Sequence, residues 1–253
     1  MSDDVLARLE TYYDAAPRAS ARTEEVGPFT LFVKSAPDGF DYYARPRLGH
    51  TGDITASDVD TVRARQRRLG VPENLEWVHD TTPSLLDAAL ASGLAVEEAP
   101  LLVLGTAAAV PPGPDVRVLG PDAEDLGRVL GVVHAGFAGS DEVEPRDTER
   151  ARRMMRVGLR AVAAAYDGRG HPVGGGSHGP RGATTELAGI AVLPRARRQG
   201  FGAALTAALV HDALGRGLTT VFLAAQDDAV ARVYQRVGFE RVGTACVAES
   251  PAP

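Results

Sequence analysis

The second half of the chain alternates short apolar runs with amphipathic segments, in an order that predicts a mixed α/β domain. Runs of β-branched and small apolar residues between glycine or proline indicate strands, and apolar residues three and four positions apart indicate helices. Strands are predicted over 116–120, 160–168, 171–179, 184–192, 218–225 and 239–248, and helices over 121–137, 144–159 and 227–238. A further helix follows Gly200 and carries Leu205 and Leu209 on one face.

The first half gives a shorter series of the same kind. Strands are predicted over 28–34, 40–46, 74–80 and 94–104, and helices over 56–70 and 82–93. Superposing Gly93 on Gly238 aligns a helix, a glycine corner and a strand in both halves, which indicates a diverged internal repeat. The alternative stays open that any α/β half-domain shows this order.

Residues 105–115 contain three prolines and mostly small residues, so they interrupt every periodic pattern. Such a segment favours an extended connection without a helix. We therefore expect a domain at 1–104, a linker at 105–115 and a second domain at 116–253. At 253 residues, with 44% hydrophobic and 24% charged residues, the chain is long enough to bury one large core or two small ones.

Charge and cysteine content narrow the functional classes. The formal net charge of −6 argues against a nucleic-acid or acidic-membrane partner recognised through bulk charge. Cys246 is the only cysteine, which excludes an intrachain disulfide and a multi-cysteine zinc site, so no metal is expected. The acidic start of the chain and the lack of a run of about 18 apolar residues indicate neither export nor membrane insertion. The sequence therefore predicts a cytoplasmic protein, with a compositional bias typical of a GC-rich bacterial genome.

The stretch "RRQGFGAAL" places two glycines between a strand and an amphipathic helix. The first N–H groups of a helix have no partner inside the helix, and the helix dipole makes that end attractive to anions such as phosphate. Gly200 and Gly202 leave these amides open to a ligand, and Arg197 and Arg198 add positive charge. The alternative is a glycine-rich turn with solvated arginines.

Two segments carry a family resemblance. "VLPRARRQGFG" is similar to the pyrophosphate loop of the GNAT superfamily of acetyl-CoA-dependent N-acyltransferases, and "RVYQRVGF" is similar to its Tyr-x-x-x-Gly-Phe segment. The resemblance covers about 115–248 and implies the GNAT fold for the second domain. A Walker-type phosphate loop and a Rossmann fingerprint fit less well, because no Gly-Lys-Ser/Thr and no third spaced glycine are present.

The resemblance implies that acetyl-CoA is the cofactor. Its diphosphate would bind to the loop amides, and its pantetheine arm would pair with the preceding strand, which would separate from its neighbour at 223–225. The residues so assigned to the cofactor are Ile190, Ala191, Val192, Arg197, Arg198, Gln199, Gly200, Phe201, Gly202, Ala203 and Asp227. Asp227 stands where the family often has an asparagine, so this contact departs from the family pattern.

The same resemblance assigns the catalytic roles. Glu186 would be the general base for the amine, and Tyr234 would be the general acid for the departing sulfur. A backbone N–H near Ile190 would donate to the thioester carbonyl. The alternatives are a solvated strand-end carboxylate at Glu186 and a half-buried packing tyrosine at Tyr234.

Other residues receive simpler interpretations. His171 and His178 flank a glycine-rich segment and are expected to be exposed turn residues, with proton transfer as the alternative. Cys246 is expected in the core. The first half lacks the glycine loop and has Ala89 where the repeat would place the tyrosine, so we expect it to have no catalytic activity. We expect it to form part of the wall of an acceptor pocket, with Trp77 or Tyr43 adding aromatic surface.

The sequence thus predicts an N-acetyltransferase that transfers an acetyl group from acetyl-CoA to a primary amine of a small molecule or peptide. The chain is expected to act as a monomer or a homodimer. A noncatalytic acyl-CoA-binding sensor or scaffold is the main alternative, and a protein that binds another nucleotide is a third.

Overall fold

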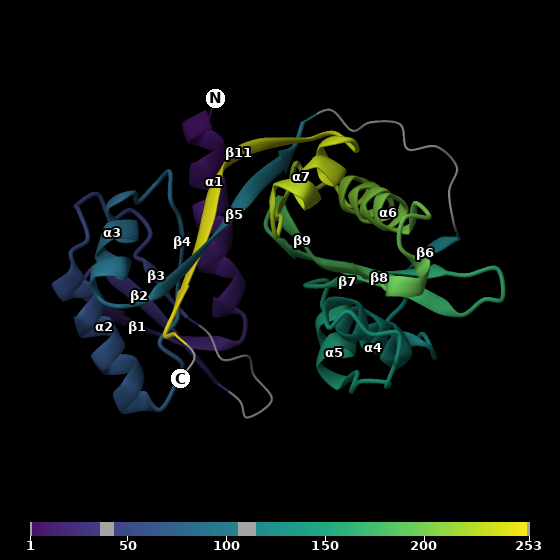
Figure 1. Ribbon diagram of the computed structural model, residues 1–253, viewed down its shortest axis with the longest axis horizontal. Coiled ribbons are helices and arrows are strands. Elements are labelled where there is room, and N and C mark those ends of the chain that lie inside the picture. The colour runs from purple at the N-terminus through teal and green to yellow at the C-terminus, as the bar shows by residue number, and fades with distance from the viewer. Residues whose placement is uncertain (1, 36–42, 106–114, 252–253) are drawn as a thin grey trace. The chain divides into compact units, whose positions relative to one another are not determined.

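The computed structural model describes residues 2–35, 43–105 and 115–251, which form two compact units (Figure 1). The first unit holds Met1–Leu101, Ala224–Asp228 and Val242–Pro253, and the second holds Leu102–Leu223 and Ala229–Arg241. The sequence analysis placed 224–228 and 242–253 with the second domain instead. Most of the predicted linker, 106–114, lies outside the described residues, so the domain boundaries stay a prediction.

The first unit is an α/β layer built on a mixed sheet. Its elements are α1 (Ser2–Arg18), β1 (Ala21–Val26), β2 (Phe29–Lys34), β3 (Ala44–Pro46), α2 (Ala56–Leu69), β4 (Leu75–Val78), α3 (Ser84–Ala91), most of β5 (Ala95–Leu104) and the later part of β11 (Phe239–Glu249). The strands pair in the order β1-β2-β3-β4-β11, with β3 and β4 parallel and the other pairs antiparallel. Phe29, Trp77 and Leu85 are fully buried in its core.

Two elements of this unit were not predicted. In α1 the buried residues Leu6, Leu9 and Tyr13 recur at helical spacing, so the sequence does carry a periodic signal for this helix. β1 has the sequence ARTEEV, in which no residue is buried. It has no apolar alternation because it pairs only along one side with β2 and buries no face, so its sequence gave no strand signal.

The second unit carries a five-stranded part of the sheet with helices on both faces. Its elements are β6 (Val116–Leu119), α4 (Leu126–Phe137), α5 (Glu149–Arg156), β7 (Ala161–Tyr166), β8 (Pro172–Arg181), β9 (Thr184–Val192), the 3₁₀ turn η1 (Pro194–Ala196), α6 (Phe201–Gly215), β10 (Thr220–Ala224), α7 (Asp228–Gln235) and the start of β11. The order is β10-β9-β8-β7-β6, and only β9 and β10 are parallel. Figure 1 shows α4 and α5 on one face of this sheet and α6 on the other. The predicted parallel pair around the glycine loop is therefore confirmed.

Small residues allow α4 to lie directly on the sheet. A Cβ at Gly175 on β8 would approach Val133 of α4 to 2.8 Å, and a Cβ at Gly136 of α4 would approach Ala191 of β9 to 3.0 Å. A Cβ at Gly131 would lie 2.1 Å from the backbone oxygen of Glu144. These contacts fix the position of α4 on β8 and β9, the strands that carry the candidate site.

The aligned halves share a local structure. Helix α3 ends before Gly93 (φ 78°) and leads into β5, while α7 ends before Gly238 (φ 99°) and leads into β11. Both glycines adopt left-handed backbone conformations, which terminate helices at low cost. This shared sequence of helix, left-handed glycine and strand supports the interpretation of the first half as a diverged copy of the second.

Several simpler expectations can be checked in the first unit. Cys246 is buried, as predicted, and burial raises the pKa of its thiol to about 12. The suggestion that Trp77 adds aromatic surface to a pocket is wrong, because its side chain is only 1% exposed and packs in the core of this unit. Within the described residues, no helix is long and apolar enough to span a membrane.

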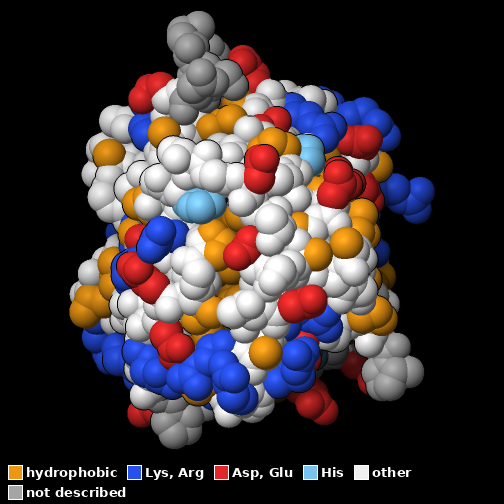
Figure 2. Space-filling model, turned by 90° about the vertical axis from the view of Figure 1, so that its left-hand side faces the viewer, with side chains coloured by type: hydrophobic (Ala, Val, Ile, Leu, Met, Phe, Trp, Pro, Cys, Tyr) orange, Lys and Arg blue, Asp and Glu red, His pale blue; other side chains and the backbone are white. Residues whose placement is uncertain are grey.

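The basic stripe of α2 lies at the surface, and its arginines are mostly paired. Figure 2 shows basic side chains gathered along the lower part of one face of the molecule. Arg63 and Arg67 each lie 2.7 Å from Glu73, and Arg65 lies 2.7 Å from Glu24. Surface pairs of this kind contribute about 0–1 kcal/mol each. They also neutralise the stripe, so α2 is a poor docking surface for an acidic partner.

Candidate functional site

β9 and β10 pair over only three residues and then separate. The register joins Thr184 to Thr220, Thr185 to Val221 and Glu186 to Phe222, although β9 continues to Val192. The separation at 223–225 expected from the sequence is therefore confirmed. It exposes the edge of β9 beyond Glu186 to a ligand that could add to the sheet as an extended strand.

A β-bulge interrupts β9 within this separated part. Gly175 of β8 pairs with Ala191, and Ser177 pairs with Ala188, so Gly176 alone lies opposite the two residues Gly189 and Ile190. Gly189 has a positive φ of 64°, which a bulge of this kind requires. Because a bulge leaves one residue outside the regular ladder, its main-chain groups become available to a ligand. The sequence analysis placed the candidate amide donor near Ile190.

The loop between β9 and α6 has an unusual backbone. After the turn η1, Arg198 adopts φ 61° and Gly200 adopts φ 86°, so two left-handed residues lie within one short segment. Arg198 is the only non-glycine residue with positive φ in the described part of the chain. A non-glycine residue in this region is strained, and alternation of such conformations forms concave arrays of amides that bind anions.

The amides of this loop have no partner among the residues that the structure describes. Within the described residues, the backbone N–H groups of residues 198–203 donate no hydrogen bond, and the next amide, that of Ala204, donates to the carbonyl of Gly200 at 3.0 Å. The N-terminus of α6 also has no side-chain cap. Six consecutive donors therefore stay unpaired within the described residues at the N-terminal end of α6, where the helix dipole favours negative charge.

A cavity of about 510 Å³ opens at this loop. Its walls come from the end of β9, the loop, the first turn of α6 and one face of α7, and include Val192, Arg198, Gly202, Val233 and Val237. Gly202 has open space where a Cβ would lie. The cavity combines an apolar wall with unpaired amides and arginines, which suits a ligand with a phosphate group and an apolar arm.

Arg197 plays a different part from Arg198. Its Nη2 donates to the carbonyl of Gly136 at 2.7 Å, and its Nε donates to the carbonyl of Val192 at 3.2 Å. Arg197 therefore ties the loop to α4 and to the end of β9, while its positive charge stays beside the unpaired amides. The sequence assigned Arg197 to the ligand and gave no sign of this tethering role.

The predicted catalytic residues lie on two different elements of the second unit. Glu186 is a partly buried residue of β9, at the last pair before the strands separate. Tyr234 is a partly buried residue of α7, and its ring packs edge to face on Phe239 at 6.1 Å. Burial raises the pKa of Tyr234, so its hydroxyl stays protonated. Tyr234 is not among the residues that line the 510 Å³ cavity, although Val233 is. Asp227 is exposed before α7 and groups with the first unit.

The two histidines have different environments. His171 is exposed, as expected. His178 was expected to be exposed as well, which is wrong, because its side chain is buried against α6. The strand β8 continues through His178 to Arg181, so His178 lies within the strand rather than in a turn, and it faces Asp212 of α6 and Thr185 of β9.

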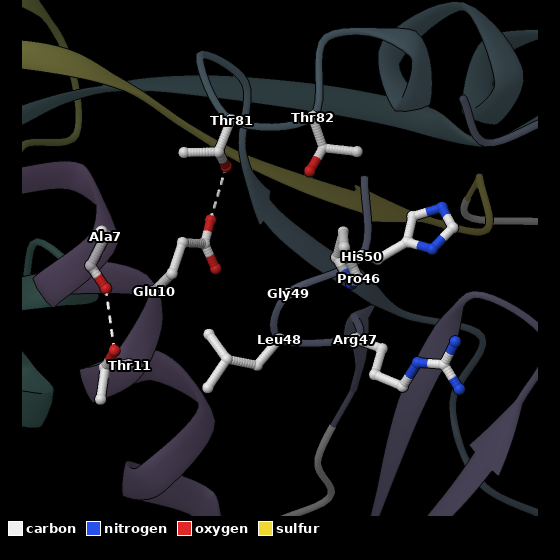
Figure 3. Close-up of a pocket in the computed structure, with 10 residues that line it drawn as sticks. All are labelled: Ala7, Glu10, Thr11, Pro46, Arg47, Leu48, Gly49, His50, Thr81 and Thr82. Carbon is white, nitrogen blue, oxygen red and sulfur yellow. Dashed lines mark hydrogen bonds between the residues drawn. The ribbon is translucent and has the colours of Figure 1, made fainter. Parts of the chain in front are cut away.

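A second cavity, of about 340 Å³, lies in the first unit (Figure 3). The carboxylate of Glu10 accepts a hydrogen bond from Thr81 at 2.7 Å and another from the buried Arg45 at 3.3 Å. Nε2 of His50, also on this cavity, is buried and has no hydrogen-bond partner among the described residues. Since the charge of Glu10 is already paired, nothing in these walls points to one ligand.

Comparisons with known proteins show the family and the fold to which this chain is similar. Residues 119–239 match the model of the acetyltransferase (GNAT) family. No curated protein sequence matches. A GCN5-related N-acetyltransferase from Kribbella flavida is similar in structure, with 23% identity and a TM-score of 0.74 over 98% of this chain and 96% of the other.

Two further solved structures share the fold. A GCN5-related N-acetyltransferase from Sphaerobacter thermophilus has 18% identity and a TM-score of 0.57, covering 89% of this chain and 81% of the other. A tandem GNAT protein from the clavulanic acid biosynthesis pathway has 20% identity and a TM-score of 0.54, covering 89% of this chain and 79% of the other. At these identities the likeness shows the mixed α/β GNAT fold.

Proposed function

Residues 119–239 form a domain of the GNAT acetyltransferase family, and we propose that the chain transfers an acetyl group from acetyl-CoA to a primary amine. The run of unpaired amides at 198–203 carries this proposal. Backbone N–H groups in a folded protein normally have a hydrogen-bond partner, so six unpaired donors in succession favour a bound ligand. A diphosphate accepts hydrogen bonds from several N–H groups at once. Acetyl-CoA supplies an activated acetyl thioester when it is bound.

The residues fit such a ligand in three places. The amides of 198–203, with Arg198 beside them and Gly202 open to a ligand, would hold the diphosphate. The separated edge of β9, at Ile190, Ala191 and Val192, would pair with the pantetheine arm. Val192, Val233 and Val237 would cover its apolar parts. Gln199, Phe201, Ala203 and Arg197 belong to the same loop and are proposed with it, and Asp227 is proposed as a further polar contact.

Glu186 and Tyr234 would supply the proton transfers. Glu186 would take a proton from the ammonium group of the acceptor, because only the neutral amine is nucleophilic. The bulge at Gly189 and Ile190 would offer a backbone N–H to the carbonyl oxygen as negative charge develops there. Tyr234, kept protonated by burial, would give a proton to the departing sulfur.

Binding and turnover test this proposal separately. Calorimetric titration with coenzyme A, ATP and NAD should show coenzyme A binding most tightly, because only coenzyme A has both a diphosphate and an arm that pairs with β9. Thiol release from acetyl-CoA, measured against a panel of primary amines, then reports transfer. Binding of coenzyme A without any turnover would favour the noncatalytic sensor, and absence of coenzyme A binding would overturn the assignment.

Variants of the two proposed catalytic residues sharpen the test. Glu186→Gln should reduce kcat by about 10²-fold or more, and Tyr234→Phe by about 10-fold or more, with coenzyme A affinity unchanged in both. Glu97→Gln removes an exposed carboxylate of β5 and serves as the matched control. Full activity in Glu186→Gln would contradict its role as the base.

A further inference from the structure

We propose that the amine acceptor also carries a carboxylate group, and that Arg160 binds this carboxylate. The inference rests on the proposed transfer function and names the substrate class of that site. Arg160 precedes β7 and had no role in the sequence analysis.

The guanidinium of Arg160 is enclosed but almost without partners. Its Nε is buried and donates no hydrogen bond within the described residues. Its one hydrogen bond there runs from Nη2 to Oγ of Ser177, at a long 3.4 Å. A guanidinium has five N–H donors, and buried donors in proteins are normally satisfied. The guanidinium of Arg160 therefore has N–H donors without an acceptor, and a bound anion would supply one.

The surrounding charge favours an anion as well. Burial lowers the pKa of Arg160, and the neighbouring positive charge of Arg150 lowers it further. Both effects make the positive charge of Arg160 costly, so a ligand with negative charge gains from binding beside this guanidinium. A carboxylate matches the fork of a guanidinium, because its two oxygens accept two parallel N–H groups.

Arg160 precedes β7, and its contact with Ser177 puts its side chain on the same face of the sheet as Glu186. Ser177 lies opposite Val162 on β7 and opposite Ala188 on β9, so these side chains share one face. Val162 belongs to the core beneath α4 and α5, which identifies that face. Glu186 is two residues from Ala188 and therefore points the same way, whereas His178 points to α6 on the opposite face.

This part of the face is open to solvent. Ala188 is exposed in the part of β9 that has separated from β10, and Ser177 is partly exposed. The residue opposite Glu186 on β8 is Gly179, which has no side chain to block the path. Two residues along a strand span about 7 Å and adjacent strands lie about 5 Å apart, so a small molecule can reach from Ser177 to Glu186.

The arrangement thus suits a compact zwitterion. Its ammonium group would lie at Glu186 and its carboxylate at Arg160, with Ser177 between them. A polycationic acceptor would meet the positive charge of Arg160 instead, which repels it.

Matched pairs of acceptors test the inference. The pairs are L-alanine with ethylamine, 4-aminobutyrate with propylamine, and L-lysine with cadaverine, which differ within each pair by one carboxylate. The full-length protein should show a kcat/KM at least 10-fold higher for the acid of one or more pairs. Equal or better use of the simple amine in every pair would overturn the proposal.

Variants identify the residue responsible. Arg160→Gln should abolish the preference for the acid by raising its KM at least 10-fold, while kcat/KM for the simple amine changes less than 3-fold. Arg160→Lys keeps the positive charge but loses the two parallel N–H donors, so its preference for the acid should lie between those of the parent protein and Arg160→Gln. Arg156→Gln, which removes an exposed arginine of α5 paired with Asp122 at 2.7 Å, should keep the preference. A preference that survives in Arg160→Gln would refute the assignment.

A binding measurement separates this inference from the transfer reaction. Calorimetric titration of the three acids in the presence of saturating coenzyme A requires no turnover. Weaker binding to Arg160→Gln than to the parent protein supports the carboxylate site even if no acetyl group is transferred. Equal binding to both, or no binding to either protein, overturns it.

Discussion

Nε2 of His178 lies 2.8 Å from Oδ2 of Asp212, and Nδ1 of the same ring lies 3.0 Å from Oγ1 of Thr185. The contact between His178 and Asp212 joins β8 to α6, the helix whose first turn carries the unpaired amides. Arg216 donates to the same carboxylate oxygen of Asp212 at 2.6 Å. A neutral imidazole satisfies both contacts, with Nε2–H donating to Asp212 and Nδ1 accepting from the threonine hydroxyl.

This contact predicts a loss of stability in mild acid. Burial lowers the pKa of His178 below its ordinary value of 6.5, more than Asp212 raises it. The unfolded chain therefore takes up this proton more readily, and the stabilising contribution, complete above about pH 6.5, is lost as the pH falls below it. Melting temperatures at pH 7.5 and 5.5 should differ less for His178→Gln than for the parent protein. An unchanged difference would argue against this origin.

The raised pKa of Glu76 predicts that stability in the first unit falls as the pH rises, which is opposite to the effect of His178. Burial raises its pKa to about 7, although the nearby Arg45 opposes this shift. Because the folded protein holds this proton more tightly, the contribution is complete below the ordinary value of 4.5 and is lost as the pH rises towards 7. Glu76→Gln should therefore gain more stability at pH 8 than at pH 5, as chemical denaturation at both pH values can measure. A larger gain at pH 5 would contradict the assignment.

A charge at Gly202 should weaken coenzyme A binding without harming the fold. A Cβ at this position meets nothing within 4 Å, and a carboxylate near a helix N-terminus stabilises the helix by about 0.3–1 kcal/mol. The same carboxylate in Gly202→Glu would occupy the amides and repel a diphosphate, so the Kd should rise at least 10-fold while the melting temperature is kept. His211→Glu places the charge on an exposed position of α6 and should leave the Kd unchanged. Equal Kd values for both variants would place the diphosphate elsewhere.

Close packing at α4 predicts that an alanine destabilises the protein at Gly131 but not at Gly215. Gly131→Ala should lower the free energy of unfolding by about 3 kcal/mol, because the added carbon would lie 2.1 Å from the backbone oxygen of Glu144. Gly215→Ala, where a Cβ meets nothing within 4 Å at the end of α6, should raise it by about 0.5 kcal/mol. Urea unfolding of the two variants gives both values. A neutral effect at Gly131 would show that the loop at 144 moves aside easily.

Local features of the site could be predicted from the sequence. The order of strands and helices in the second half follows from apolar spacing, and the left-handed conformations of Gly200 and Gly238 are ones that glycine favours, whereas that of Arg198 has no such signal in the sequence. The candidate residues Glu186 and Tyr234 were found through the family resemblance, and their roles stay predictions. In the first unit the charged edge strand β1 gave no such signal, since it buries no residue.

The sequence by itself determined most of the strands and helices, and where an anion could meet a helix N-terminus, because these depend on neighbours only a few residues apart. The tertiary structure alone decided that Arg160 and Glu186 share a face, that His178 meets Asp212, and that Arg197 is held by the carbonyl of Gly136. Each of these depends on strand register or on helix packing, and a shift of one residue would turn every side chain of a strand to the other face. Register is set by contacts between distant segments, which local periodicity does not encode.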